Sequence, residues 1–147
     1  TMGHFVTDLD AKVGSRKIDG RWTRVAILES EFIYDSPEFG IVQVPYGFPS
    51  DGASVPRFLW NLYPPFGRYL EAAVIHDWFC VLGNAGTSPI ASQDAAKLFL
   101  EVMRSMGINW WRRYKMYLAV RVFGPRFKAS NMAHKSLTRH VNAKSDI

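Results

Sequence analysis

Residues 67–82 read GRYLEAAVIHDWFCVL, and this stretch decides the fold. Its apolar residues occupy nearly every face of a helix drawn through it, whereas a surface helix carries a single apolar stripe. A helix that is hydrophobic all round is buried, so other parts of the chain must cover it on several sides. The sequence therefore predicts a central helix from about Gly67 or Arg68 to Leu82, with the remaining elements packed around it.

Two more helices are predicted after the central one. Over 92–106 the large apolar residues keep the spacing of one buried stripe, and Gly107 follows as a C-terminal cap would. Over 109–123, Asn109 is placed to cap the first turn, and a Gly-Pro pair after Phe123 cannot continue the helix. The C-terminal half is thus expected to be a three-helix unit.

The first half of the chain reads as strands. Short β-branched or aromatic segments occur at 24–27, 31–34 and 41–44, and residues 35–40 have the composition of a turn. We expect an antiparallel meander here. With a length of 147 residues, the chain is predicted to form one α+β domain over 22–127, preceded by an N-terminal arm over 1–21 and followed by a basic tail over 128–147.

Composition limits the classes of protein. Hydrophobic residues make up 48% of the chain, which is typical of a globular domain. Cys80 is the only cysteine, so the fold cannot depend on an internal disulfide. Neither a secretion signal nor an apolar run of roughly 20 residues is present, so we expect a protein without a transmembrane segment that is compatible with a reducing cytoplasm.

Basic residues gather at the C-terminal end. Residues 104–147 hold ten Lys or Arg and one acid, whereas residues 1–103 hold eight bases and twelve acids. The predicted third helix combines this charge with aromatic rings, and its candidate binding residues are Trp110, Trp111, Arg112 and Lys115. A protein partner, a nucleic acid or an anionic lipid would each suit such a surface, and a solvated helix face is the alternative.

His76 and Asp77 are the polar residues that the central helix has to accommodate. A carboxylate removed from water without a partner costs several kcal/mol, so Asp77 should be hydrogen-bonded or should line a cleft. Adjacent helical residues point about 100° apart, so the pair can line two walls of one pocket. In the structural alternative, Asp77 accepts hydrogen bonds from loop amides and His76 is a satisfied core histidine.

Three other places offer polar groups for a site. The segment 50–56 supplies Asp51 as a candidate metal ligand and Ser54, with Arg57 just beyond it, as candidate binding residues. Asp94 lies early in the second helix, on a face that favours solvent, and could reach His76 only if the helix were tilted. Cys80 follows His76 by one turn but is expected to be an inert buried thiol.

The order of these motifs resembles a known family. Residues 44–48 (VPYGF), 51–57 (DGASVPR), 72–77 (AAVIHD) and 94–103 follow one another as in the phage and prophage family known as domain of unknown function 1353. The resemblance covers roughly 22–124 and implies a phage-encoded protein, expected in the host cytoplasm or associated with the virion. No established activity accompanies it.

A weaker resemblance concerns the chemistry of the central helix. His76-Asp77, followed by Asp94 on a second helix, looks like the core of phospholipase A2 enzymes, in which a His activates water and the neighbouring Asp binds calcium. The resemblance implies His76 as base, Asp94 as the residue that orients it, and Asp77 as ligand of calcium or another divalent metal.

Three hypotheses follow for function. The first is an accessory or assembly protein that binds a phage or host protein, the second is a metal-assisted hydrolase that uses His76 and Asp77, and the third is a nucleic-acid-binding protein. Exposure separates the first two, because a hydrolase needs His76 reachable from solvent, whereas a structural role predicts that both residues are buried and hydrogen-bonded.

Overall fold

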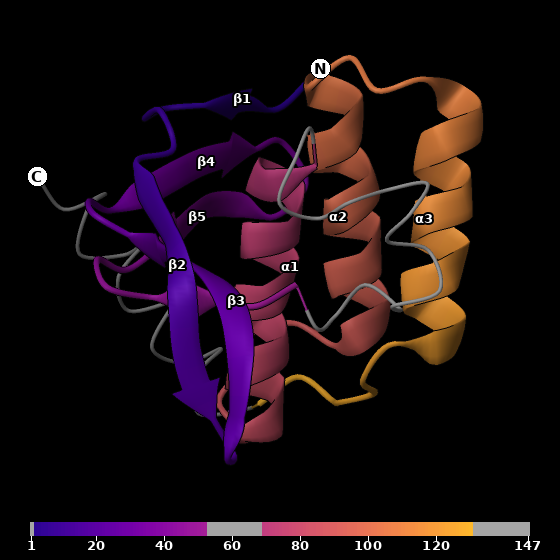
Figure 1. Ribbon diagram of the computed structural model, residues 1–147. Coiled ribbons are helices and arrows are strands. Elements are labelled where there is room, and N and C mark those ends of the chain that lie inside the picture. Colours follow the sequence, from indigo (N-terminus) through magenta and orange to yellow (C-terminus); the bar gives the residue numbers. More distant parts are fainter. Residues whose placement is uncertain (1, 53–68, 131–147) are drawn as a thin grey trace, which may run out of the picture.

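The computed structural model describes residues 2–52 and 69–130 and shows an α+β fold (Figure 1). Three helices follow a set of antiparallel strands, as the sequence predicted. The elements in chain order are β1 (His4–Phe5), β2 (Ala11–Ile18), β3 (Arg21–Leu28), β4 (Phe32–Ser36), β5 (Gly40–Val44), β6 (Pro49–Ser50), α1 (Leu70–Asn84), α2 (Ser92–Ser105) and α3 (Trp110–Phe123). None of the described helices is long and apolar enough to cross a lipid bilayer.

The strands form two sheets, not one continuous meander. One sheet has the order β1-β4-β5 and the other has the order β2-β3-β6. The expected turn at 35–40 is present, because β4 and β5 pair as a hairpin in which Ser36 lies opposite Gly40. The break falls between β3 and β4, where the backbone of Leu28 instead pairs with the segment before β6, donating to Phe48 and accepting from Gly47.

Two strands form within the predicted N-terminal arm. β1 pairs with β4, and β2 pairs along its whole length with β3. The β2–β3 connection is a tight turn at Asp19 and Gly20, both with positive φ, of 49° and 80°. Such a two-residue turn twists in the same sense as the strands it joins, which explains the long regular hairpin.

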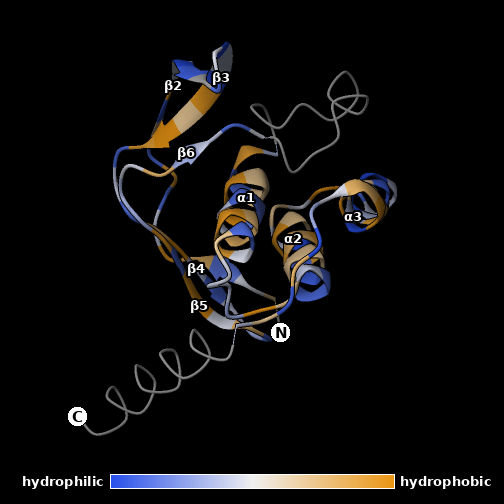
Figure 2. Ribbon diagram, turned by 90° about the horizontal axis from the view of Figure 1, so that it is seen from below, coloured by the Kyte–Doolittle hydropathy of each residue, from blue (hydrophilic) through white to orange (hydrophobic). Residues whose placement is uncertain are grey.

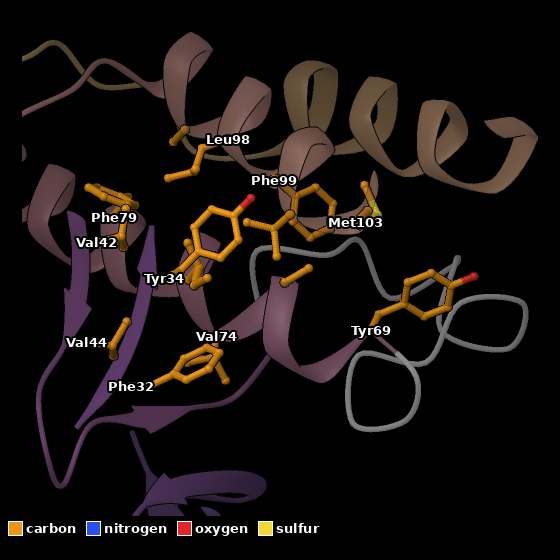
Figure 3. Close-up of a cluster of buried hydrophobic side chains, with 14 of the residues drawn as sticks. Phe32, Tyr34, Val42, Val44, Tyr69, Val74, Phe79, Leu98, Phe99 and Met103 are labelled. Atoms are coloured by element: carbon orange, nitrogen blue, oxygen red, sulfur yellow. The ribbon is translucent and has the colours of Figure 1, made fainter. Parts of the chain in front are cut away.

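The core lies between the β1-β4-β5 sheet and the first two helices (Figure 3). Alternate residues of β4 are buried, as expected of a strand with one face on a core. They pack against α1, which is buried from Ala72 to Asp77 and again at Phe79 and Cys80. The prediction of a central helix covered on several sides is therefore confirmed.

The helices are arranged in successive layers, with α2 between α1 and α3 (Figure 2). α2 ends at Ser105 with Met106 as its C-cap. Gly107 follows with a φ of 73°, as the sequence indicated, and Ile108 donates back to the carbonyl of Met103. The start of α3 is also confirmed, because the side chain of Asn109 accepts a hydrogen bond from the backbone N–H of Trp111. Among the helices, α3 packs mainly on α2, and the side of α3 away from α2 is exposed.

The chain returns to the other helices after α3 ends. The Phe127 ring lies so close to Gly83 of α1 that a Cβ at Gly83 would overlap it. Two backbone hydrogen bonds fix the segment after α3. The Ser92 N–H donates to the Phe127 carbonyl (3.0 Å), and the Ser130 N–H donates to the Ser88 carbonyl (2.7 Å). A glycine is required at position 83 because only a residue without a side chain admits the ring.

Candidate functional site

Asp77 joins the central helix to the sheet that contains β6. Its Oδ2 atom accepts a hydrogen bond from the Ser50 hydroxyl and another, of 3.0 Å, from the backbone N–H of Gly52. The side chain is 5% exposed, so these donors replace water around a buried carboxylate. We call Asp77, Ser50 and Gly52 the Asp77 clamp.

The local sequence explains how the donors reach Asp77. Ser50 ends β6, which pairs with β3 so that Ser50 lies opposite Ala26. Gly52 has a φ of 70°, in the left-handed region that favours glycine. The strand pairing fixes the hydroxyl and the glycine turns the following backbone, so both donors converge on one carboxylate oxygen.

His76 is buried within the helical layers. It is 3% exposed, and its ring centroid lies 5.2 Å from that of Phe99 on α2. Its Nδ1 atom lies 3.7 Å from the sulfur of Cys80, one turn along α1. Burial lowers the pKa of His76 to about 4, so the imidazole is neutral at pH 7.

Cys80 shares this apolar environment. Burial, followed by the negative charge of Asp77, raises the pKa of the Cys80 thiol to about 12. A thiol that stays protonated is a poor nucleophile at neutral pH. This agrees with the expectation of an inert thiol.

Acidification is expected to destabilise the protein through His76. The ordinary pKa of histidine is 6.5, and the folded value is about 4, so between these values the unfolded chain binds more protons than the folded chain. The free energy of unfolding should therefore fall as the pH drops from 6.5 to 4, by about 3 kcal/mol at most.

Urea unfolding at several pH values, for wild type and His76→Gln, measures this contribution. Glutamine cannot take up the proton, so the variant should lose less stability on acidification than wild type does. Equal losses in the two proteins would assign the pH dependence to other groups.

The remaining predicted site residues are not all gathered at the Asp77 clamp. Asp94 is half-buried in the first turn of α2, and no hydrogen bond joins it to His76 within the ranges 2–52 and 69–130. Asp51 lies between the two clamp donors and is half-buried. Ser54 and Arg57 lie outside the described residues. Across the described ranges, no three His, Cys, Asp or Glu side chains form a group that could hold a metal ion.

The predicted binding residues of α3 lie on an exposed surface. Trp110, Trp111, Arg112 and Lys115 are all exposed, Trp111 by 63%. At about 100° per residue, Trp111, Tyr114, Leu118 and Val122 fall within roughly 80° of one another. All four are exposed, and we call them the α3 outer face.

The α3 outer face is opposite the side that holds the helix in place. The buried residues of α3 are Met116, Ala119 and Val120. Lys115 and Arg121 flank the outer face on its two sides. The Lys115 ammonium lies 5.9 Å from the Trp111 ring centroid, and the Arg121 guanidinium donates a hydrogen bond to the Tyr117 hydroxyl. The helix thus has two apolar sides, one against α2 and one toward solvent with a cation at each margin.

Sequence reasoning identified Asp77 but not both of its partners. The structural alternative named loop amides as the donors. The Gly52 amide is a donor of this kind, whereas the Ser50 hydroxyl was not anticipated. The available signal was Gly52, because a glycine after a short strand often marks a left-handed residue that can direct its amide toward an anion.

Comparison with known proteins assigns the chain to a family without an assigned activity. A family model described as "Protein of unknown function (DUF1353)" matches residues 26–120, and the chain belongs to this family. Two relatives come from Sinorhizobium fredii: the uncharacterized protein y4jT is 39% identical over 100 residues, and the uncharacterized protein y4iH is 31% identical over 80 residues.

These relatives are much longer than the matched region. The first match covers 67% of this chain and 28% of y4jT, and the second covers 53% of this chain and 31% of y4iH. No solved structure matches the chain.

Proposed function

We propose that this protein is an accessory or assembly protein of a phage or prophage, and that it binds a protein partner through the α3 outer face. The motif resemblance given above supports the phage origin. The partner would be met in the host cytoplasm or on the virion. The observation that carries the binding role is the outer face itself, with four exposed apolar side chains on one side of a helix whose opposite side is buried.

The composition of this surface favours association with another protein. Contiguous exposed apolar side chains mark interaction sites, and Trp, Tyr and Arg are the residues that most often dominate binding energy. From Asn109 to Ser130 the chain carries six Lys or Arg and no acid. A partner with an apolar groove bordered by carboxylates would therefore complement both the apolar stripe and its charged margins.

The geometry gives less support to a hydrolase that uses His76 and Asp77. A general base must reach the proton it removes directly or through one water, and His76 is buried against Phe99. One oxygen of Asp77 already accepts two hydrogen bonds. Both features match the structural alternative for this pair.

Affinity capture followed by quantitative binding tests the proposal. Three tagged proteins would be incubated with lysate from induced or infected host cells. They are the wild type, the α3 variant Trp111→Ala/Leu118→Ser, and the control Ile41→Ser/Tyr46→Ser. The control removes two exposed apolar side chains in β5 and just after it, outside the α3 outer face. A protein retained by wild type and control but lost by the α3 variant would then be purified, and we expect its Kd to rise at least about tenfold with the α3 variant.

Two results would contradict the proposal. In the first, the purified partner binds the α3 variant as tightly as wild type. In the second, sedimentation shows that wild type self-associates through the outer face and that no other protein is retained. The second result would assign the face to contact between copies of this chain.

A further inference from the structure

A second surface stands apart from the helices. The β2–β3 hairpin, which we call the ribbon (Ala11–Leu28), joins the body near its base, where Val25, Ala26 and Leu28 are buried. Farther out, residues 12–17 and 19–22 are exposed, and Trp22 near the tip is 75% exposed. Figure 2 shows the ribbon standing off from the three helices.

Positive charge is concentrated on the ribbon. Its 18 residues contain five bases and one acid, Asp19, although residues 1–103 as a whole contain eight bases and twelve acids. The five bases are Lys12, Arg16, Lys17, Arg21 and Arg24. None of them forms an ion pair with a carboxylate in the described part of the chain. Unpaired cations on an exposed arm point to an anionic partner.

The register places these cations on both faces of the ribbon. Residues directly opposite each other share a face, and alternate residues of one strand do so as well. Lys17 pairs with Trp22 and Ser15 pairs with Arg24, which puts Lys17, Trp22 and Arg24 on one face. Arg16 pairs with Thr23, which puts Arg16 and Arg21 on the other.

A partner that carries negative charge on two opposing walls fits this arrangement better than a partner with a flat acidic surface. A flat acidic protein or a membrane surface would contact one face of the ribbon and leave the cations of the other in solvent. The major groove of B-form DNA is about 12 Å wide, admits a two-stranded ribbon, and has a phosphate backbone along each wall. The major groove of A-form RNA is too narrow to admit one.

We infer that the ribbon is a binding arm for duplex DNA. Arg16 and Arg21 would contact the phosphates of one wall, and Lys17 and Arg24 would contact those of the other. The arm would enter the groove tip first, which brings the exposed Trp22 ring to the bases. This inference is independent of the protein partner proposed for α3, because the two surfaces share no residue.

Fluorescence anisotropy with a labelled duplex of about 24 base pairs tests the arm, at salt concentrations from about 50 to 200 mM. The ribbon variant would be Arg16→Gln/Lys17→Gln/Arg21→Gln/Arg24→Gln. The matched control would be Arg112→Gln/Arg113→Gln/Lys115→Gln/Arg121→Gln on α3, which removes the same net charge. We expect about 100-fold weaker binding by the ribbon variant and a change below about threefold for the control.

The salt dependence gives a second readout. Each phosphate contact contributes about −0.9 to the slope of log affinity against log salt, so four contacts predict a slope near −3.6 for wild type and a much flatter one for the ribbon variant. All four replaced side chains are exposed, so circular dichroism should show an unchanged fold. If the fourfold variant unfolds, Lys17→Gln/Arg24→Gln serves instead, with an expected loss of about tenfold.

Three results would overturn the inference. The first is the absence of DNA binding by wild type at low salt. The second is an equal loss of affinity in the ribbon and α3 variants, which would assign binding to net charge alone. The third is equal affinity for duplex RNA of the same length, because the groove argument requires a preference for the B form.

Discussion

Replacing Asp77 with alanine should lower the free energy of unfolding by about 3–5 kcal/mol. The carboxylate is the shared acceptor for the Ser50 hydroxyl and the Gly52 amide, and both donors would lose this partner inside the protein. A buried donor left without an acceptor costs about 1–3 kcal/mol, and the removed side chain would also leave a cavity. Urea unfolding followed by circular dichroism measures the loss.

Two controls make this prediction specific. Asp77→Asn keeps the volume and one carbonyl acceptor, so its loss should be smaller, about 1–2 kcal/mol. Asp94→Ala removes a half-buried carboxylate in the first turn of α2, where only the helix dipole is affected, and should cost under about 1 kcal/mol. A loss as small for Asp77→Ala as for Asp94→Ala would show that the Asp77 clamp does not hold the fold.

Such a result would favour the alternative in which Asp77 binds a metal ion. Calorimetry with calcium and zinc, on wild type and a folded Asp77→Asn variant, would then decide whether the carboxylate binds a cation. Binding that disappears with Asp77 would favour the hydrolase hypothesis over the structural one. A destabilised Asp77→Ala protein without metal binding in wild type would confirm the clamp.

Replacing Phe99 with alanine should cost about 3–5 kcal/mol, a large part of the 5–15 kcal/mol by which such domains are usually stable. Phe99 is completely buried on α2 and its ring faces His76 on α1. The change removes one of the buried apolar groups between the two helices and leaves a cavity beside an imidazole. Leu118→Ala is the control, because this large apolar side chain on α3 is exposed and should contribute little.

The Phe99→Ala variant should also change the titration of His76. The pKa of His76 is lowered to about 4 by burial, so a cavity that admits water should raise it toward 6.5. Titration of the imidazole by NMR in wild type and Phe99→Ala reports this shift. An unchanged pKa in a destabilised variant would mean that the helices collapse onto the cavity and keep water out.

The helices could be predicted from the sequence because their signals are local. Asn109 caps the first turn of α3 and Gly107 follows the last turn of α2, as the sequence predicted, and each affects only the backbone within about one turn. The burial of the central helix around Ala73 could likewise be predicted without knowing what packs on it, because apolar residues occupy nearly all of its faces. Burial of His76 and Asp77 follows from that character, but the identity of their neighbours does not.

The sheets were harder to predict because strand pairing joins residues far apart in the chain. Nothing near Leu28 indicates that the next strand leaves its sheet, since that depends on the pairing of β3 with β6. β2 was missed for another reason. It covers no core, so it lacks the alternation of apolar and polar residues by which strands are recognised, and the Asp19-Gly20 turn was its one local signal.

The family match begins at Ala26, near the base of the ribbon, so most of the arm lies outside the shared body. Between Gly14 and Arg24 the described side chains of the arm are exposed apart from the half-buried Thr23, and its two faces alternate with each residue. Removing or adding two residues in each strand would therefore keep every remaining side chain on its face. The ribbon is in this sense adjustable, since its reach changes in steps of about 7 Å while the folding of the body is left untouched.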